Sequence, residues 1–373
     1  MHLPPFALDL WLGQHRSSSP PIRYNLASST GPRWTLRELL DLGGPSARGD
    51  LESLALCYTP TAGGAALRRR IGELDGVDPD WVVVTTGASE ALLVLMCLVA
   101  EPGATVLLPA PAFPAFSVTA LAWGLGVRTY ALSRERGFEH TARAIAAAVD
   151  ETTRLVLVNS PHNPSGAVMP TEEIVALAEM LDARGVLLAV DEVYHPLYAG
   201  PARPSAARIP NTVVMGDMSK ALSLGGLRVG WIIDRVADRR ERLAEMRGYF
   251  TVSGSPVTEA LSEIALASAE HILARARDVI GANLSALERF MAAHAGMLAW
   301  VKPAGGTTAF PWFTDGRDAR PFAEMLAGQG VLVTPGDCFG GRDHFRVGLG
   351  AEPAAFADAL ALVSRVLAAG GGR

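Results

Sequence analysis

One lysine stands in an unusual setting for a charged residue. Lys220 lies in the run DMSKALSLGGLRVGW (217–231), where small and apolar residues surround it and Arg228 follows eight positions later. A lysine on a solvated helix face has charged neighbours, so this pattern does not indicate a surface position. A lysine in such a segment can act as a nucleophile, because its amine forms a Schiff base with a carbonyl compound.

Three further groups follow apolar runs of the sequence. The turn GASE (87–90) comes after VVVTT and opens a helix, so its backbone N–H groups and the Ser89 hydroxyl can bind an anion. An N-cap serine without any ligand has the same pattern. Asn163 offers an amide from the tight loop SPHNPSG (160–166). Asp191 ends the run VLLAV, where a buried carboxylate is costly unless it meets a cation.

The cation beside Asp191 could be a metal ion or a protonated ring nitrogen. Glu192 and His195 do not complete a cluster with metal-ligand spacing, so the ring nitrogen is favoured. His162 lies beside a proline-rich turn, and we expect it to be a packed histidine. A lysine, a buried acid, a positioned amide and an anion-binding helix start suit an aldehyde-bearing phosphorylated pyridine, which is pyridoxal 5'-phosphate (PLP).

The elements that position these groups can be read from the pattern of hydrophobic residues. Between about residues 80 and 235, helical segments alternate with short apolar runs: WVVVTT, ATVLLPA, VRTYAL, TRLVLVNS, VLLAVDE, TVVMGDM and RVGWIID. This alternation predicts an α/β fold with a mostly parallel sheet that helices cover on both faces. Ligands bind at the carboxyl ends of such strands, where the groups above lie.

The rest of the chain differs in character. Long helical segments follow residue 236, and a smaller α+β unit comes after them. We expect an N-terminal arm with part of the small domain at 1–44, a large PLP-binding domain at 45–250, and a connecting helix with the small C-terminal domain at 251–373.

Composition excludes several classes of protein. No apolar run of the 373 residues approaches the roughly 20 needed to span a bilayer, and no secretory signal is apparent, so we expect a cytoplasmic enzyme. The net charge of −5 and the scattered basic residues argue against nucleic-acid binding. Cys57, Cys97 and Cys338 match neither a disulfide framework nor a metal motif, and we expect three buried thiols.

Seven motifs resemble, in order, those of the fold-type I PLP-dependent enzymes of the aminotransferase class I/II family. They are YTPTAGGAALRRRI, TTGASEAL, PAPAFPAF, NSPHNPSG, DEVYHPLY, SKALSLGGLRVGW and FRVGLG, and the resemblance runs over nearly the whole chain. It implies the fold of that family: a large domain with a mostly parallel seven-stranded sheet, a smaller α+β C-terminal domain, and a homodimer with active sites at the subunit interface.

The resemblance also implies a role for each matched residue at the cofactor ring. Lys220 would form the Schiff base and then move the substrate's α-proton. Asp191 would pair with the pyridine nitrogen, Tyr194 and Asn163 would hydrogen-bond the ring hydroxyl, and Phe113 would stack on the ring.

At the phosphate, the resemblance implies a cradle formed by Ala88, Ser89, Ser219 and Arg228, completed by Tyr58 of the neighbouring subunit. One position departs from the family pattern, because Asp217 stands where the family has Ser or Thr. A carboxylate beside a phosphate dianion is unfavourable. Asp217 therefore points away, or is neutralised, or the cradle is altered.

At the substrate, the resemblance implies that Arg346 binds the α-carboxylate in a bidentate pair. It places Ser29 and Gly31, with their neighbours Ser28 and Thr30, over the substrate. A polar arm that only grips the partner subunit would have the same sequence.

The reaction is less firmly indicated than the cofactor. The segments YNLASSTGPRWTLRELL, PAGGTTAFPWFT and VLVTPGDCFGG are similar to those of capreomycidine synthase-like cyclising enzymes of natural-product pathways, whereas the tyrosine of DEVY is typical of aminotransferases. We therefore predict an aminotransferase acting on an α-amino acid. The alternative is a lyase, cyclase or side-chain bond-forming enzyme of secondary metabolism. A PLP-binding regulator without activity is disfavoured, because Lys220 and Arg346 are both retained.

Overall fold

The computed structural model describes residues 3–370, and its centre is one seven-stranded sheet. The strands are β2 Val82–Thr85, β3 Thr105–Ala110, β4 Gly126–Ala131, β5 Thr153–Asn159, β6 Leu187–Asp191, β7 Thr212–Asp217 and β8 Gly230–Asp234. Their spatial order is β2-β8-β7-β6-β5-β3-β4. Strand β8 is antiparallel to both neighbours and every other pair is parallel. The prediction of a mostly parallel seven-stranded sheet is therefore confirmed.

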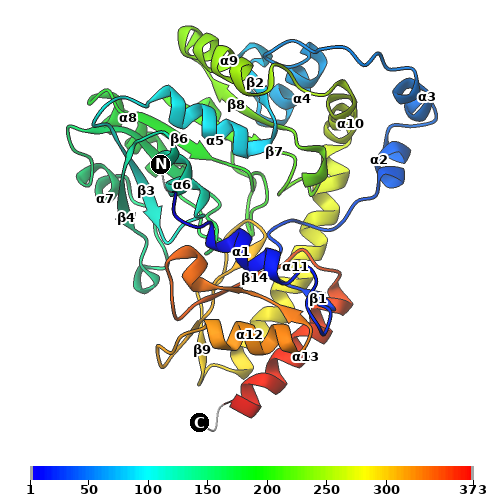
Figure 1. Cartoon of the computed structure of the whole chain (residues 1–373), viewed down its shortest axis with the longest axis vertical. Coiled ribbons are helices and arrows are strands. Elements are labelled where there is room, and N and C mark those ends of the chain that lie inside the picture. Colours follow the sequence, from blue (N-terminus) through cyan, green and yellow to red (C-terminus); the bar gives the residue numbers. More distant parts are fainter. Residues whose placement is uncertain (1–2, 371–373) are drawn as a thin grey trace.

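Thirteen α-helices accompany the sheet in the described part of the chain (Figure 1). They are α1 Ala7–Gln14, α2 Leu36–Leu42, α3 Ala47–Glu52, α4 Ala65–Asp75, α5 Gly87–Leu98, α6 Ala115–Ala122, α7 Ala142–Ala147, α8 Thr171–Asp182, α9 Ala237–Thr251, α10 Pro256–Ala267, α11 Ala269–Ala293, α12 Arg320–Gly328 and α13 Pro353–Gly370. Helix α8 begins at Thr171, directly after Pro170.

Both faces of the sheet are buried, and successive residues of one strand enter different cores. Leu155 and Leu157 of β5 pack in a core that α5, α6 and α9 complete. Val156 and Val158 of the same strand pack on the opposite face, in a core that includes residues of α4, α7 and α8. This double burial explains why the strands read as continuous apolar runs rather than as an alternating pattern.

The C-terminal part is built from short strands and helices. Its strands are β9 Leu298–Ala299, β10 Thr308–Ala309, β11 Trp312–Phe313, β12 Val331–Leu332, β13 Thr334–Pro335 and β14 Phe345–Gly348. Strand β1, Tyr24–Asn25, pairs parallel with β12, so N-terminal residues join this part of the molecule. In Figure 1 the long helix α11 descends from the sheet toward α12 and α13, and α1 lies across the junction.

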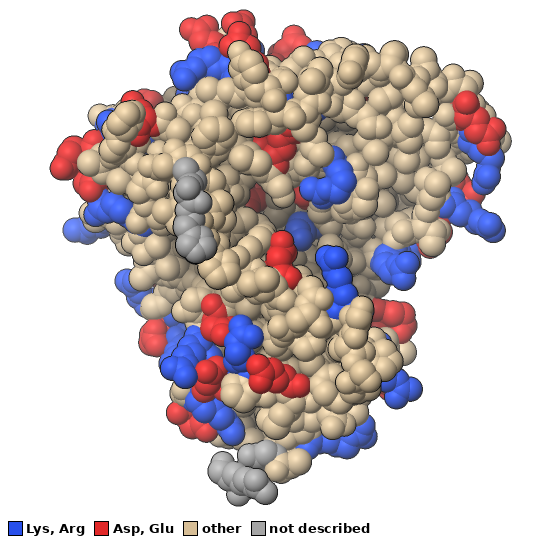
Figure 2. All heavy atoms as spheres, viewed as in Figure 1, with Lys and Arg blue, Asp and Glu red and all other residues tan. Residues whose placement is uncertain are grey.

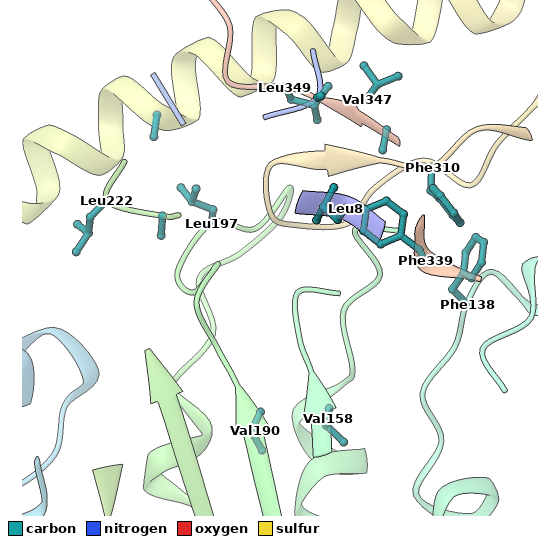
Figure 3. Close-up of a cluster of buried hydrophobic side chains, with 14 of the residues drawn as sticks. Leu8, Phe138, Val158, Val190, Leu197, Leu222, Phe310, Phe339, Val347 and Leu349 are labelled. Carbon is teal, nitrogen blue, oxygen red and sulfur yellow. The ribbon is translucent and has the colours of Figure 1, made fainter. Parts of the chain in front are cut away.

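A continuous hydrophobic core crosses this junction (Figure 3). The residues labelled there include Val158 and Val190 of the sheet, Leu197 and Leu222 of the loops after β6 and β7, Leu8 of α1, and Phe310, Val347 and Leu349 of the C-terminal part. The loops at the carboxyl edge of the sheet are therefore held between the two parts of the molecule.

The cysteines only partly follow the prediction. Cys338 is buried, but Cys57 is exposed and Cys97 is partly exposed. The prediction of three buried thiols is thus wrong for Cys57, because it lies in the coil between α3 and α4. Within residues 3–370, no helix combines the length and the apolar character needed to cross a membrane.

Two glycine substitutions should have opposite effects on stability. A Cβ atom at Gly348 of β14 would collide with the Ser28 carbonyl oxygen, so Gly348→Ala should lower the free energy of unfolding by about 1–3 kcal/mol. Gly281 lies within α11 and has no atom within 4 Å of its Cβ position, so Gly281→Ala should raise it by about 0.5–1 kcal/mol. Urea unfolding followed by circular dichroism measures both changes. Equal effects would contradict the close packing of the N-terminal segment on β14.

Candidate active site

Polar side chains gather in one cavity at the carboxyl edge of the sheet. Its volume is about 490 Å³. The polar and charged residues that line it are Thr30, Ser89, Thr119, Asn159, Asn163, Asp191, Tyr194, Asp217, Ser219, Lys220 and Arg228. The structure therefore brings together residues that are more than a hundred positions apart in the sequence, because parallel strands end at the same edge.

Lys220 enters this cavity from the turn after β7. Its amine donates a hydrogen bond to the Ser29 hydroxyl at 3.0 Å. Burial lowers the pKa of the amine from its ordinary value, and the negative charge of Asp217 opposes that shift. A buried lysine with a lowered pKa has a larger neutral fraction than an exposed lysine, so Lys220 is suited to attack a carbonyl carbon.

Asp191 is the last residue of β6 and is also buried. Burial raises the pKa of its carboxyl group to about 7, although its Oδ1 atom accepts a hydrogen bond from the Val193 N–H at 3.1 Å. A cation in contact with this group would favour the ionised form. The cavity wall thus offers an acid that suits a protonated ring nitrogen.

Tyr194 and Asn163 also line the cavity. The Tyr194 hydroxyl is buried and makes no hydrogen bond of normal geometry among the described residues, although the Ser29 side chain is near enough to lower its pKa. Burial outweighs that effect and raises the pKa of Tyr194 to about 12. Asn163 is held in place, because its N–H donates to Asn159 Oδ1 at 2.7 Å and the Asn159 amide donates to the Asp191 carbonyl at 3.2 Å. A buried hydroxyl without a partner marks a position where a polar ligand atom would gain a hydrogen bond.

At the other end of the cavity the first turn of α5 meets Arg228. The Arg228 guanidinium donates to the Gly225 carbonyl at 3.1 Å and to the Ser219 hydroxyl at 3.4 Å. Gly230 of β8 permits the close approach of α5, since a Cβ atom there would lie 2.7 Å from the Ala88 nitrogen. An arginine, a serine hydroxyl and the free N–H groups of a helix start together can bind a phosphate.

Asp217 lies in the wall of the same cavity and is only 7% exposed. Its Oδ1 atom accepts the Ser219 N–H at 2.9 Å, so the carboxylate caps the turn that leads to Lys220. The structure therefore does not turn Asp217 away from the cavity. A negative charge stands close to the groups that suit a phosphate.

Arg346 of β14 lies behind the cavity, where it is 1% exposed. Its guanidinium donates to Asn163 Oδ1 at 2.9 Å and to the Ala27 carbonyl at 2.7 Å, while its buried Nε has no partner among the described residues. Burial lowers the pKa of Arg346 to about 10, so the side chain remains charged at neutral pH. A carboxylate that reached Arg346 would find a positive charge with an unused donor.

The segment 28–31 closes the cavity beside Lys220. Ser29 accepts the hydrogen bond from the lysine, and its carbonyl accepts one from the Thr307 hydroxyl at 2.8 Å. Gly31 packs so closely that a Cβ atom would collide with the Ser223 hydroxyl. Both residues thus lie against the turn that carries Lys220, and Thr30 between them lines the cavity.

Two aromatic residues meet at the mouth of the cavity. Phe113 lines it, and its ring centroid lies 5.7 Å from that of Phe6 in an edge contact. Sequence reasoning missed Phe6, because no pattern links the segment before α1 to the sheet. It also missed Asn159, although the position of Asn159 at the end of LVLVN was an available signal.

Tyr58 and His162 also lie outside the cavity. Tyr58 is 85% exposed and does not reach the site of its own chain. His162 is buried, with its ring nitrogens 2.7 Å from the Ser165 hydroxyl and 3.0 Å from the Pro111 carbonyl, and burial lowers its pKa well below the ordinary value. His162 is thus the packed histidine that the sequence predicts. Within residues 3–370, no group of three or more His, Cys, Asp or Glu side chains is arranged to hold a metal ion.

Known proteins share both the sequence and the fold. The family model described as aminotransferase class I and II matches residues 48–361. Capreomycidine synthase of Streptomyces vinaceus is 32% identical, over 98% of this chain and 94% of that protein. The arginine–pyruvate transaminase AruH of Pseudomonas aeruginosa is also 32% identical, over 79% of each chain.

Two solved structures extend the likeness over the whole fold. A PLP-dependent aminotransferase from Streptococcus suis matches with a TM-score of 0.91 and 25% identity, covering 99% of each chain. The PLP-dependent cyclase OrfR matches with a TM-score of 0.89 and 27% identity, covering 99% of this chain and 98% of that one. The chain therefore belongs to the aminotransferase class I and II family of PLP-dependent enzymes.

Proposed function

We propose that the protein is an aminotransferase that removes the amino group of an α-amino acid and passes it to a keto acid. The observation that carries this proposal is the single cavity in which the buried Lys220 amine and the Asp191 carboxyl stand together, with Arg228 and the start of α5 at its far end. Several relatives of the chain are aminotransferases, which supports the reaction type.

The residues of the cavity fit the ring of PLP. Asp191 would be stabilised in its ionised form by a protonated ring nitrogen, and the unpartnered Tyr194 hydroxyl and the Asn163 amide would bond the ring hydroxyl. Phe113 would cover one face of the ring.

The far end of the cavity fits the phosphate. Ala88 and Ser89 at the start of α5, together with Ser219 and Arg228, would bind its oxygens.

Lys220 is the residue that we assign to proton transfer. When bound, PLP withdraws electrons from the substrate and makes the hydrogen on the α-carbon acidic. Lys220 Nζ would hold the cofactor at its aldehyde carbon, and as a free amine it would take the proton from the α-carbon of the substrate. Its lowered pKa keeps part of the population neutral and able to do so.

The substrate carboxylate would bind at Arg346, whose Nε has no hydrogen-bond partner among the described residues. Arg346 would hold it through the guanidinium, and the side chain of the substrate would then lie near Phe6, Phe113 and Thr30. Ser29 and Gly31 would cover the bound substrate and limit the access of water.

A lyase or cyclase is the second candidate. Capreomycidine synthase matches 98% of the chain, whereas the arginine–pyruvate transaminase matches 79%, and a PLP-dependent cyclase shares the fold. In that case removal of the α-proton by Lys220 would be followed by loss or replacement of a group on the substrate side chain. The enzyme would then act in a pathway of secondary metabolism.

The proposal includes a homodimer. Exposed hydrophobic side chains that would suit a subunit interface are Leu56, Tyr58, Tyr249, Phe250 and Val252. The surface over α4, α10 and the preceding coil carries few charged side chains in the view of Figure 2. Tyr58 would cross this interface and bind the cofactor phosphate of the partner subunit.

The division of the chain is proposed as well. The N-terminal arm (1–44) joins the small domain through the pairing of β1 with β12, the large domain spans 45–250, and α11 connects it to the C-terminal domain within 251–373. Three free cysteines fit the reducing cytoplasm that we propose as its location.

Spectroscopy of the PLP-loaded protein tests the reaction. Each common amino acid and hydroxylated arginine is mixed with the enzyme without a keto acid, and the absorbance is followed. An aminotransferase should convert its cofactor to the amine form and release a keto acid, and pyruvate or 2-oxoglutarate should restore the aldehyde form. Lys220→Ala should lower the rate by at least about 100-fold, because the positioned base is lost. A modified amino acid formed without any keto acid would refute transamination and support the cyclase.

Asp217 should weaken the binding of PLP. Asp217→Ser removes a like charge beside the phosphate, so the dissociation constant of PLP should fall about tenfold, equivalent to about 1.4 kcal/mol. Equilibrium dialysis of the cofactor-free protein measures this constant, and competition by inorganic phosphate isolates the phosphate site. Asp358→Ser on α13 is the control, because that acid is exposed and distant. An unchanged or weaker affinity in Asp217→Ser would contradict the assignment of this end of the cavity to the phosphate.

A further inference from the structure

A buried arginine outside the cavity has no part in the chemistry described above. Arg247 of α9 is completely buried, and the two carboxylates that act on it, Glu90 and Glu259, are 5% and 4% exposed. Burial lowers the pKa of Arg247, and the two glutamates oppose that shift. Three charged groups are therefore removed from water in one cluster. This costs free energy of folding unless well-placed opposite charges and hydrogen bonds offset it.

The first side of this cluster fixes the start of α5. The Glu90 carboxylate accepts a hydrogen bond from the Thr86 N–H, directly before the turn that would bind the phosphate. The Thr251 hydroxyl donates to the other Glu90 oxygen at 2.6 Å, and Arg247 Nε lies 3.6 Å from the carboxylate. Arg247 thus holds the glutamate that in turn holds the phosphate-binding turn.

The second side fixes a segment that leads away from the site. Arg247 donates to the Thr61 carbonyl, and Glu259 accepts hydrogen bonds from the Thr59 hydroxyl at 2.8 Å and from the Gly64 N–H at 2.9 Å. Segment 59–64 directly follows Tyr58. The exposed tyrosine therefore projects from a piece of backbone that the buried charges hold at several points.

We propose that Arg247 is a positioning residue for two active sites at once. Within one subunit it fixes the phosphate-binding turn of that subunit's own site, and it fixes the segment that carries Tyr58 to the partner's site. This inference rests on the homodimer and on the phosphate position of the proposed function. An arginine is needed, because Nη1 donates to the Thr61 carbonyl while Nε lies 3.6 Å from the Glu90 carboxylate, in an ion pair without a hydrogen bond. A lysine offers one point charge and cannot serve both positions.

Mixed dimers separate the two effects. One subunit carries Lys220→Ala, so only the other subunit can form the visible absorbance band of lysine-bound PLP. The active site of that other subunit receives Tyr58 from the Lys220→Ala subunit. Arg247→Lys is then placed either in the subunit with Lys220 or in its partner. Titration with PLP gives the dissociation constant of the one competent site.

The inference expects a dissociation constant about tenfold higher with Arg247→Lys in either subunit, equivalent to about 1.4 kcal/mol. A change in only one of the two arrangements overturns the double role, and so does no change in either. Arg242→Lys, an exposed residue of the same helix, is the matched control and should have no effect.

Milder variants keep the test decisive if Arg247→Lys does not fold. Thr251→Val removes only the hydroxyl that bonds Glu90, so it should weaken PLP binding only in the subunit that carries Lys220. Thr59→Val removes only the hydroxyl that bonds Glu259, so it should act only from the partner subunit. The reverse pattern, or equal effects from both subunits, overturns the inference.

Failure of the proposed function gives a different result. If the wild-type protein stays monomeric in light scattering, or forms no lysine-bound PLP, the proposed function fails and the inference fails with it. If the wild-type dimer binds PLP and the Arg247→Lys dimers bind it equally well, the inference alone is overturned.

Discussion

The burial of charge at one edge of the sheet is the constraint on which the site depends. Asp191 and Asp217 end neighbouring strands, and Lys220 and Arg228 follow within the same cavity. Both aspartates are buried and Lys220 is partly buried, whereas Arg228 is exposed. Removing a charged group from water costs several kcal/mol unless an opposite charge meets it. Burial raises the pKa of Asp191 and lowers the pKa of Lys220, because it disfavours the charged form of each group. A ligand with a protonated ring nitrogen would favour the ionised form of Asp191 and so offset its part of that cost.

The rest of the fold maintains this arrangement. The loop that carries Asn163 is fixed to β6 through Asn159, and Arg346 reaches it from the C-terminal part. Ser29 binds Lys220 from the N-terminal segment. The cavity is therefore closed by three regions that are distant in the sequence. The continuous core of Figure 3 fixes their positions relative to one another. A change in how the two parts pack would alter the charges as well as the shape of the site.

Sequence patterns predicted what local rules determine. The inner strands were visible as apolar runs because both faces of the sheet are buried there, whereas the edge strand β4 is largely exposed or half-buried. Asp191 and Lys220 were visible because a charge directly after such a run is unusual. Phe6 and the Arg247 cluster depend on contacts between distant segments, which no local pattern records. The exposure of Cys57 was missed for the same reason, since residue type gives only a tendency to be buried.

The same physical reasoning explains why the cofactor is easier to predict than the reaction. Transamination and cyclisation both begin with loss of the α-proton, so both require the residues that hold PLP and the base Lys220. The shared motifs encode those residues and cannot distinguish the two outcomes. The fate of the substrate after proton transfer depends on how its side chain is held, and in the proposed position that side chain would lie near Phe6, Phe113 and Thr30, which line the cavity. Phe6 lies outside the shared motifs, so only the assembled structure brings it to the cavity.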